Sequence, residues 1–402
     1  MIFKLKINAN NLLLYIILIP FLHPRGFDEY IPLYKNLFTI WLYVALAGIF
    51  LLLIFEASQN RMSTKAYLWG VMLYFGVMSL LTLFIRQSFS NALQKCFATP
   101  ALCVLGAIYL NIKPEPFIRI VNNLLKLNFF LNLTIFNPLL WKEYFEPITN
   151  HITFIGHVQL GAQLGILGVF LGYLEYYFYA KNKKKLIWQI FLSISVLVIS
   201  FTSASYIALI ILFIFAFLEK TKFRKVFTYR SLTYVWFYLI GNILLLSLIV
   251  LYSGASLEIL GFSLNGRGYI WKEAFESFMK SPIYGYGVQG VSIKVFWSYW
   301  VGDGQGMNYM HNQLLQVLND GGVILFIPFI YMLILNLKNL DKLKNGRLKF
   351  WSMICIMSML ITMTFESTME YFYVFFMFIT IAYLPDIVLR EEKGNRVIGE
   401  KI

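Results

Sequence analysis

Apolar runs of membrane length recur along the chain, and short polar segments separate them. A helix needs about 20 apolar residues to cross the hydrocarbon core of a bilayer, and only helices or closed barrels satisfy their backbone groups there. No stretch alternates with the period of a barrel strand. The pattern therefore predicts an all-α polytopic membrane protein. About 12 transmembrane helices are expected, at 11–22, 33–55, 66–85, 97–112, 117–136, 158–180, 186–200, 204–218, 232–252, 321–338, 349–365 and 371–389.

One polar interruption is much longer than the others and spans 253–320. Its first part carries a stripe of apolar residues at helical spacing, which predicts a short amphipathic helix at the membrane interface. The stripe comprises Ile270, Trp271, Ala274, Phe275, Phe278 and Met279. Pro282 ends the pattern, and Gly285 and Gly287 follow in a turn. A purely structural re-entrant element is the alternative interpretation of this helix.

Composition and charge favour a membrane protein over a nucleic-acid-binding one. Hydrophobic residues make up 59% and charged residues 13% of the chain, whereas soluble proteins carry about 25% charged residues. The net charge is +14, but the basic residues cluster between apolar runs, at 181–185, 221–225 and 338–349. Such clusters mark cytoplasmic loops. We expect the whole chain, 1–402, to form a single integral membrane domain.

The basic clusters also predict which parts of the chain face outward. An N-terminus in the cytoplasm, combined with the predicted spans, places every basic cluster inside and the large loop 253–320 outside. All four histidines then lie at or near the outer face, together with three arginines. These residues are His23, His151, His157, His311, Arg25, Arg86 and Arg267. We therefore expect a catalytic site in the extracytoplasmic loop, facing outward from the membrane.

Two residues of the large loop suggest chemistry, and two carboxylates lie on the outer side of the last pair of predicted helices. The guanidinium of Arg267 can bind phosphate through two parallel hydrogen bonds, although an arginine that reaches lipid headgroups is the alternative. A neutral His311 can accept a proton from a sugar hydroxyl, although a capping or interfacial histidine is the alternative. Glu366 and Glu370, four residues apart, are expected to share a helix face. Functional and structural roles are equally supported for this pair.

The order of motifs in the loop resembles a known family. Arg267 and Trp271 form an R-x-x-x-W pattern, residues 282–287 form P-x-x-G-x-G, and His311-Asn312 begins H-N-x-x-L. This order resembles the O-antigen polymerase/ligase superfamily, whose members are polytopic membrane glycosyltransferases. With an earlier segment, the resemblance covers the C-terminal two-thirds of the chain.

Two segments depart from the pattern of this family. The segment 156–161 is similar to a G-x-H-x-N-x-x-G element, but Val158-Gln159 replaces the usual Pro-Asn. The family often carries Ser-Arg in the turn that corresponds to 202–206, and Tyr206 stands here in place of the arginine. If a second arginine binds the substrate, Arg25 and Arg86 are candidates because they are expected on the same face.

The resemblance implies transfer of a glycan from an undecaprenyl-diphosphate carrier. His311 is the implied base and Arg267 the residue that holds the diphosphate. The implied substrate-binding residues are Arg86, Arg25, His157, Asn312, Trp271, Gly285, Gly287 and Glu366. No metal or cofactor is expected, because the sequence contains no HExxH, DxD, Walker or dinucleotide motif. Basic residues can stabilise a leaving diphosphate without a metal.

We predict a polysaccharide polymerase that joins lipid-linked oligosaccharide repeat units of O-antigen or capsule, with inversion, on the outer face of the cytoplasmic (inner) membrane. An O-antigen ligase, which uses another acceptor, is the alternative within the family. A flippase or transporter of lipid-linked sugars is the alternative outside it. The abundance of Lys, Asn, Ile and Phe, typical of AT-rich genomes, favours the polymerase. Expected partners are the lipid-linked donor and acceptor, membrane lipid, a flippase and a chain-length regulator, but no nucleic acid.

Overall fold

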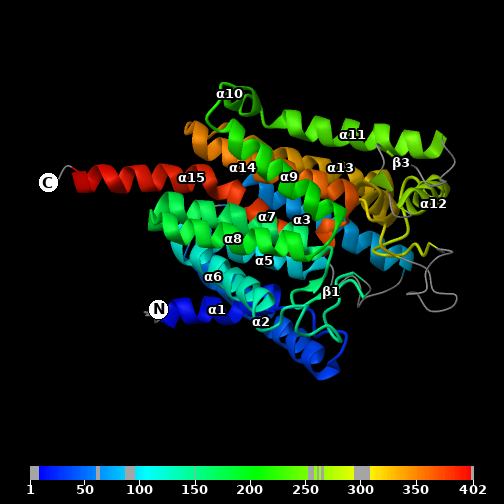
Figure 1. The fold of residues 1–402 in the computed structure, drawn as a ribbon, viewed down its shortest axis with the longest axis horizontal. Helices are drawn as coiled ribbons and strands as arrows, with labels where there is room; N and C mark the ends of the chain where they lie inside the picture. The colour runs from blue at the N-terminus through cyan, green and yellow to red at the C-terminus, as the bar shows by residue number, and fades with distance from the viewer. Residues whose placement is uncertain are drawn as a thin grey trace.

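Helices make up most of the part of the chain that the computed structural model describes (Figure 1), namely residues 9–59, 64–86, 96–148, 150–251, 258–259, 262–263, 267–293 and 308–399. The α-helices are α1 Ala9–Leu22, α2 Pro32–Ser58, α3 Ala66–Leu81, α5 Ala98–Ile112, α6 Pro114–Leu133, α7 Leu160–Glu175, α8 Lys183–Ile199, α9 Ser203–Leu218, α10 Phe223–Phe227, α11 Leu232–Leu251, α12 Arg267–Lys280, α13 Gln313–Asp341, α14 Gly346–Phe365 and α15 Tyr373–Gly399. The π-helical turns η1 (Thr82–Arg86) and η2 (Tyr176–Ala180) extend α3 and α7, and the 3-10 turn η3 (Thr368–Glu370) separates α14 from α15. Two antiparallel hairpins pair β1 (Ile152–Thr153) with β2 (Gly156–His157) and β3 (Glu258–Ile259) with β4 (Phe262–Ser263).

Each predicted membrane span falls on a helix, so the all-α membrane class is confirmed. Among the described residues, six helices are long and apolar enough to cross a membrane: α2, α3 with most of η1, α11, α13, α14 and α15. Apolar segments of α1, α5 and α9 are shorter than a full span. The count of twelve spans is not confirmed and remains a prediction. The predicted span at α6, for example, contains Arg119 and Lys126, which lower its mean hydropathy.

The helix α7 forms the centre of the bundle, since all of its side chains from Leu160 to Glu175 are buried. Small residues let α8 approach it closely. A Cβ atom added to Gly161 would lie 2.4 Å from Cβ of Ser200, and one added to Gly168 would lie 2.4 Å from Oγ of Ser193. The turn between α8 and α9 is thereby held beside the start of α7, at the end of the bundle that carries the β1–β2 hairpin (Figure 1).

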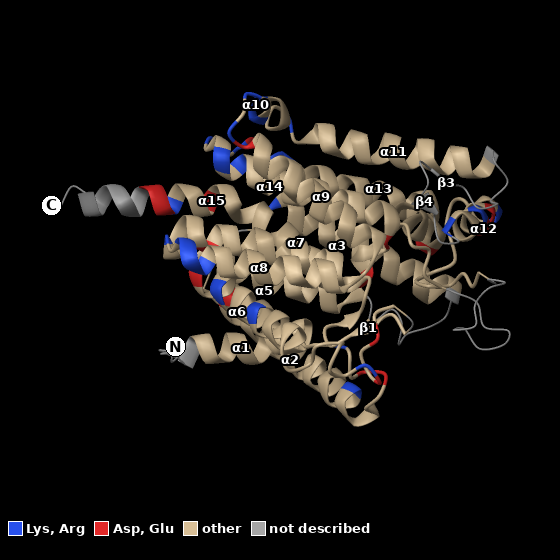
Figure 2. Ribbon diagram, in the orientation of Figure 1, with Lys and Arg blue, Asp and Glu red and all other residues tan. Residues whose placement is uncertain are grey.

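Basic residues gather at one end of the bundle. Figure 2 shows the lysines and arginines of α8, α10 and the start of α14 at this end, whereas α12 and the β1–β2 hairpin lie at the other. This distribution matches the clusters at 181–185, 221–225 and 338–349 that were expected to face the cytoplasm. The spans predicted at 186–200 and 204–218 are two separate helices, because α8 ends at Ile199 and α9 begins at Ser203.

The predicted amphipathic helix is α12, whose bounds are Arg267–Lys280. Ile270, Trp271 and Ala274 of the predicted stripe are buried, but Met279 is 58% exposed, so the buried face covers only the first turns. The expected span at 321–338 also begins earlier, since α13 starts at Gln313 and passes through a kink at Gly322. The residues 294–307, which belong to the same loop, lie outside the described part of the chain.

Candidate active site

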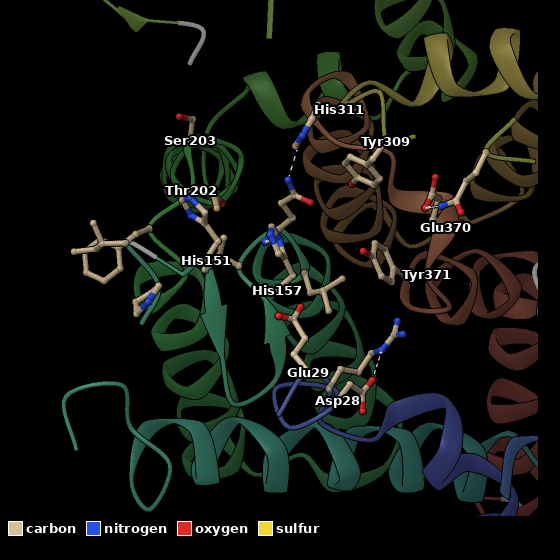
Figure 3. A pocket seen from close by; sticks show the side chains of 18 of the residues that line it. Asp28, Glu29, His151, His157, Thr202, Ser203, Tyr309, His311, Glu370 and Tyr371 are labelled. Carbon is tan, nitrogen blue, oxygen red and sulfur yellow. Dashed lines mark hydrogen bonds and ion pairs between the residues drawn. The ribbon is translucent and has the colours of Figure 1, made fainter. Parts of the chain in front are cut away.

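A cavity of about 1350 Å³ lies at the end of the bundle that carries α12 and the β1–β2 hairpin (Figure 3). Its walls combine segments that are far apart in the sequence, and polar side chains make up much of the lining. The polar and aromatic lining residues include Arg25, Asp28, Glu29, Lys35, Asn36, His151, His157, Gln159, Thr202, Ser203, Arg267, Gln289, Tyr309, His311, Glu370 and Tyr371. The cavity therefore brings together four of the predicted site residues: Arg25, His157, Arg267 and His311.

The buried carboxylate of Glu366 links the two predicted catalytic residues. Its Oε1 accepts a hydrogen bond from Nη2 of Arg267 at 2.6 Å, and its Oε2 lies 3.1 Å from Nδ1 of His311. Glu366 is fully buried, whereas the side chains of Arg267 and His311 are each 12% exposed and line the cavity. The three residues form a continuous chain, with the carboxylate behind the two cavity-facing groups.

The contacts of His311 define which ring nitrogen carries the proton. Nδ1 lies 3.0 Å from Nε2 of Gln159 as well as 3.1 Å from the carboxylate of Glu366. A deprotonated Nδ1 would face the carboxylate with a lone pair, so the favourable arrangement has Nδ1–H donating to Glu366. The amide of Gln159 then presents its oxygen, because amide orientation is an assignment made from the hydrogen-bond network. Nε2 of His311 is left as the proton acceptor.

Electrostatics keep the carboxylate of Glu366 ionised. Burial raises its pKa, but Arg267 and His311 lower it more strongly, so the net pKa lies below the ordinary value of a glutamate. Tyr309 completes this arrangement, because its hydroxyl donates to Oε2 of Glu366 at 3.3 Å and accepts from the backbone N–H of Ser367 at 3.0 Å. Burial, assisted by Glu366, raises the pKa of Tyr309 well above its usual value, so it stays a neutral donor.

The predicted substrate-binding residues Trp271 and Asn312 lie behind the cavity wall, and we interpret them as positioning residues. Nε1 of Trp271, which is fully buried, donates to the backbone carbonyl of His311 at 3.3 Å. Nδ2 of Asn312 donates to Oδ1 of Asn242 at 2.8 Å and to the carbonyl of Thr364 at 2.9 Å. Oδ1 of Asn312 also caps α13. Together they hold His311 at φ +49, a backbone conformation that side chains rarely adopt.

The glycine turn at 282–287 docks on the kink of α13, and its glycines do not line the cavity. Gly285 has φ +64, and a Cβ atom there would lie 2.5 Å from the carbonyl oxygen of Asn319. A Cβ atom on Gly322, which has φ +59, would lie 2.3 Å from the carbonyl oxygen of Ile283. Gly287 donates its N–H to the carbonyl of Asp320 at 2.9 Å. The P-x-x-G-x-G motif thus supports close backbone contact in the protein. Contact of Gly285 and Gly287 with substrate stays a prediction.

Arg25 supplies a second cation to the cavity. The backbone N–H of Arg25 donates to the carbonyl of Ile155 at 3.2 Å, and a Cβ atom on Gly156 would lie 3.1 Å from Cβ of Arg25. The β1–β2 hairpin therefore holds this arginine beside the helix α7. Its Nε lies 3.2 Å from Oδ2 of Asp28, and its guanidinium lies 5.7 Å from the ring centre of Tyr371. The side chain remains 41% exposed, so part of it is open to a ligand.

Two other positions bear on the second cation. Tyr206, which stands where the family carries arginine, is 37% exposed and does not line the cavity, although the neighbouring Thr202 and Ser203 do. Arg86 ends the turn η1, and its side chain lies outside the described part of the chain. Arg25 is therefore the candidate that the geometry supports.

His157 is a neutral member of the cavity wall. Burial is the main cause that lowers its pKa to about 4; Glu366 opposes this shift, and the nearby His151 and His311 add to it. The backbone N–H of Gln159 donates to Nδ1 of His157 at 3.4 Å, so the proton of the neutral ring belongs on Nε2. His157 can therefore donate a hydrogen bond to a ligand near neutral pH.

Sequence reasoning missed several residues of the site. Gln159 was noted only as a departure from the family pattern, and Tyr309 stands two residues before His311 with no motif of its own. Glu370 lines the cavity and accepts a hydrogen bond from Nε2 of Gln289 at 2.7 Å. It does not share a helix face with Glu366 as predicted, because α14 ends at Phe365 and Glu366 is extended. No group of three or more His, Cys, Asp or Glu side chains could hold a metal within the described residues.

Comparison with known proteins agrees with the geometry of the site. Residues 188–330 match a protein-family model described as O-antigen ligase. This match supports the resemblance to the O-antigen polymerase/ligase superfamily, and it covers about a third of the chain. The match includes Arg267, Trp271 and His311 and ends before Glu366, while Arg25 and His157 precede it. Proteins of this superfamily are membrane enzymes that transfer glycans. No curated protein matches the chain.

Proposed function

We propose that the protein is a polysaccharide polymerase that joins oligosaccharide repeat units carried on undecaprenyl diphosphate. The observation that carries the proposal is the chain from Arg267 through Glu366 to His311 at the wall of a large polar cavity. Arg25 provides a further cation in that cavity. A base can activate the acceptor hydroxyl, and the two guanidinium groups can stabilise the leaving diphosphate.

The proposed reaction begins at the hydroxyl of the acceptor sugar. Nε2 of His311 takes the hydroxyl proton while the oxygen attacks the anomeric carbon of the donor glycan. The bond from that carbon to the diphosphate oxygen breaks, and the lipid diphosphate leaves with the electron pair. Arg267 and Arg25 stabilise the departing anion. Attack from the side opposite the diphosphate inverts the anomeric configuration.

Glu366 supports both halves of this reaction. Its carboxylate holds Nδ1–H of His311 and stabilises the imidazolium that forms when Nε2 is protonated. It also occupies Nη2 of Arg267, which leaves the other terminal nitrogen for the diphosphate. His157 and Gln159 lie beside His311 and provide hydrogen-bonding groups for sugar hydroxyls.

The charge distribution supports an outward-facing site in the cytoplasmic membrane. The basic ends of α8, α10 and α14 lie at the end of the bundle opposite α12 and the β1–β2 hairpin (Figure 2), as expected if those ends face the cytoplasm. Lipid-linked donors and acceptors would then enter the cavity from the outer leaflet. A flippase that delivers these lipids and a chain-length regulator are the proposed partner proteins.

An O-antigen ligase is the second candidate, because the matched family model carries that description. The two activities share a donor and differ in the acceptor, which is either another repeat unit or a different molecule. A transporter of lipid-linked sugars is less favoured, because moving a lipid across the membrane needs no base. The pairing of His311 with a buried carboxylate argues for bond formation.

The decisive experiment supplies purified protein with lipid-linked repeat units and measures glycan length. The wild type should build longer glycans, and His311→Ala should build none. His151→Ala is the matched control, because it removes an imidazole that lines the same cavity and has no role in the proposed reaction. Polymer formation by His311→Ala would exclude the proposed base. Transfer only to a non-repeat acceptor would indicate a ligase, and movement of lipid without bond formation would indicate a transporter.

Arginine substitutions test how the diphosphate is bound. Arg267→Lys keeps the positive charge but removes the planar guanidinium, which can serve Glu366 and a phosphate at once. We expect Arg267→Lys to lose nearly as much activity as Arg267→Ala. Activity of Arg267→Lys close to that of the wild type would show that charge alone suffices at this position.

A further inference from the structure

A second large cavity runs between α11 and α14, and its lining shares no residue with that of the candidate active site. It is a groove of about 1010 Å³, and nearly all of its walls are apolar. The α11 wall extends from Thr233 to Gly241 and the α14 wall from Met357 to Phe365. The nine residues on each side are separated by eight helical rises, which give a length of about 12 Å and suit a hydrocarbon chain.

The space inside the groove is open along α11. A Cβ atom added to Gly241 would meet no atom within 4 Å. The hydroxyl of Tyr238 is buried and has no hydrogen-bond partner among the described residues. Side chains of a helix lean toward its N-terminus, so the ring of Tyr238 leans toward the end of α11 that follows Arg230. A buried, unpaired hydroxyl in an apolar groove calls for a polar atom from an occupant.

Two cations stand at one mouth of the groove. Lys225 and Arg230 both line it, and neither forms an ion pair with a described residue. The guanidinium of Arg230 lies 5.5 Å from the ring centre of Tyr229, which also lines the mouth and is 75% exposed. Phe227 of α10 continues the apolar wall below these cations.

This mouth lies beside α10, at the end of the bundle opposite α12 (Figure 1). Oγ of Ser231, the residue after Arg230, donates to Oδ2 of Asp341 at 2.7 Å, and Asp341 ends α13. Asn312 marks the opposite end of the same helix, beside the active-site cavity. At that end, Nδ2 of Asn242 donates to Oγ1 of Thr364 at 3.1 Å and links the two walls.

We propose that this groove binds a phospholipid with an anionic headgroup. Lys225 and Arg230 contact its phosphate, Tyr238 donates to an ester oxygen, and the acyl chain fills the space beside Gly241. The carrier lipid of the reaction is a less suitable occupant, because its diphosphate would lie a helix length away from His311. The basic mouth is instead positioned for a lipid of the leaflet on the side of the lysine clusters.

Lipid binding can be measured by native mass spectrometry of purified protein with equimolar phosphatidylglycerol and phosphatidylcholine. The wild type should retain phosphatidylglycerol preferentially. Each basic residue near a membrane surface contributes about fivefold to anionic lipid binding, so the double variant Lys225→Ala/Arg230→Ala should lower the preference on the order of thirtyfold. The control Lys184→Ala/Lys185→Ala removes the same charge from exposed positions of α8 and should keep it.

A second pair of variants tests the groove itself. Gly241→Phe fills the open space and should abolish retention of both lipids, whereas Gly76→Phe, placed on the exposed face of α3 where space is also open, should not. Thermal unfolding midpoints confirm that each variant is folded. The proposal would be overturned if the two double variants lost the preference for phosphatidylglycerol equally. Full lipid retention by folded Gly241→Phe would overturn it too. Displacement of phosphatidylglycerol by equimolar undecaprenyl diphosphate would overturn it as well.

Discussion

Replacing Glu366 with glutamine tests whether the buried carboxylate organises the proposed active site. The substitution keeps the size of the side chain and removes its charge. If the amide oxygen stays on Nη2 of Arg267, the amide nitrogen must face Nδ1 of His311. Nδ1 then becomes an acceptor and the proton moves to Nε2. The nitrogen that should take the proton of the acceptor sugar would already carry one.

The size of the effect follows from the interactions that are lost. A hydrogen bond to a charged group contributes about 1.5–3 kcal/mol, which corresponds to roughly 10- to 160-fold in rate. The wrong tautomer of His311 adds to this loss, so we expect kcat to fall on the order of 100-fold or more. Breaking a buried ion pair also costs about 3–5 kcal/mol of stability, because the charge of Arg267 loses its partner.

The assay must separate lost chemistry from lost structure. Initial rates of glycosidic bond formation from lipid-linked repeat units give kcat and KM, and thermal unfolding reports the folded fraction. Glu370→Gln is the matched control, because Glu370 lines the same cavity but contacts Gln289 and not His311. A folded Glu366→Gln variant with kcat within about threefold of the wild type would refute the reasoning. So would an equal loss in Glu370→Gln.

Three further substitutions test separate parts of the site. Gly322→Ala places an alanine at φ +59 with its Cβ atom 2.3 Å from the carbonyl oxygen of Ile283. Backbone strain alone should therefore lower the free energy of unfolding by about 1–3 kcal/mol. An unchanged midpoint of thermal unfolding would contradict the role of the kink. Burial holds the pKa of His157 at about 4, below the value of about 6.5 in an unfolded chain. The unfolded chain therefore binds more protons between these pH values, and the free energy of unfolding should fall by about 2 kcal/mol from pH 7 to pH 5. The thermal unfolding midpoint of His157→Gln should fall less over this range than that of the wild type. Arg25→Ala should raise KM for the lipid-linked donor about tenfold, because one charge-assisted hydrogen bond is lost. Lys35→Ala is the control and should raise KM less, since it removes an exposed cation from the same cavity.

The helices could be predicted from the sequence because apolar runs in a membrane have no other stable form. The start of α13 could not, since Gln313, Gln316, Asn319 and Asp320 have the composition of a loop. These side chains are nevertheless buried. They use their polar atoms locally, as when Oδ1 of Asp320 accepts hydrogen bonds from Gln316 and from the backbone of Gln289. Without knowledge of their hydrogen-bond partners, such polar side chains are indistinguishable in sequence from those of a solvent-exposed loop.

The sequence predicted the chemical groups of the candidate site but not the contacts that bring them together. Arg267 and His311 were identified from residue types and order, but the carboxylate that joins them comes from the end of α14, and 55 residues separate it from His311. Arg25 reaches the cavity from before α2, through backbone contact with the β1–β2 hairpin. Spacing along the chain cannot indicate such contacts, because they depend on how the helices pack.

The charges of the central cluster explain why one carboxylate serves two cations. Before reaction, Glu366 balances the buried charge of Arg267, while His311 is neutral in the proposed mechanism. Transfer of the acceptor proton creates an imidazolium beside Glu366 at the moment when negative charge develops on the leaving diphosphate. Glu366 can then pair with His311, and Arg267 can pair with the diphosphate, so that no charge is left uncompensated in a poorly solvated site. Proton transfer and departure of the diphosphate are coupled in this arrangement, because either one alone would leave an unbalanced charge next to Glu366.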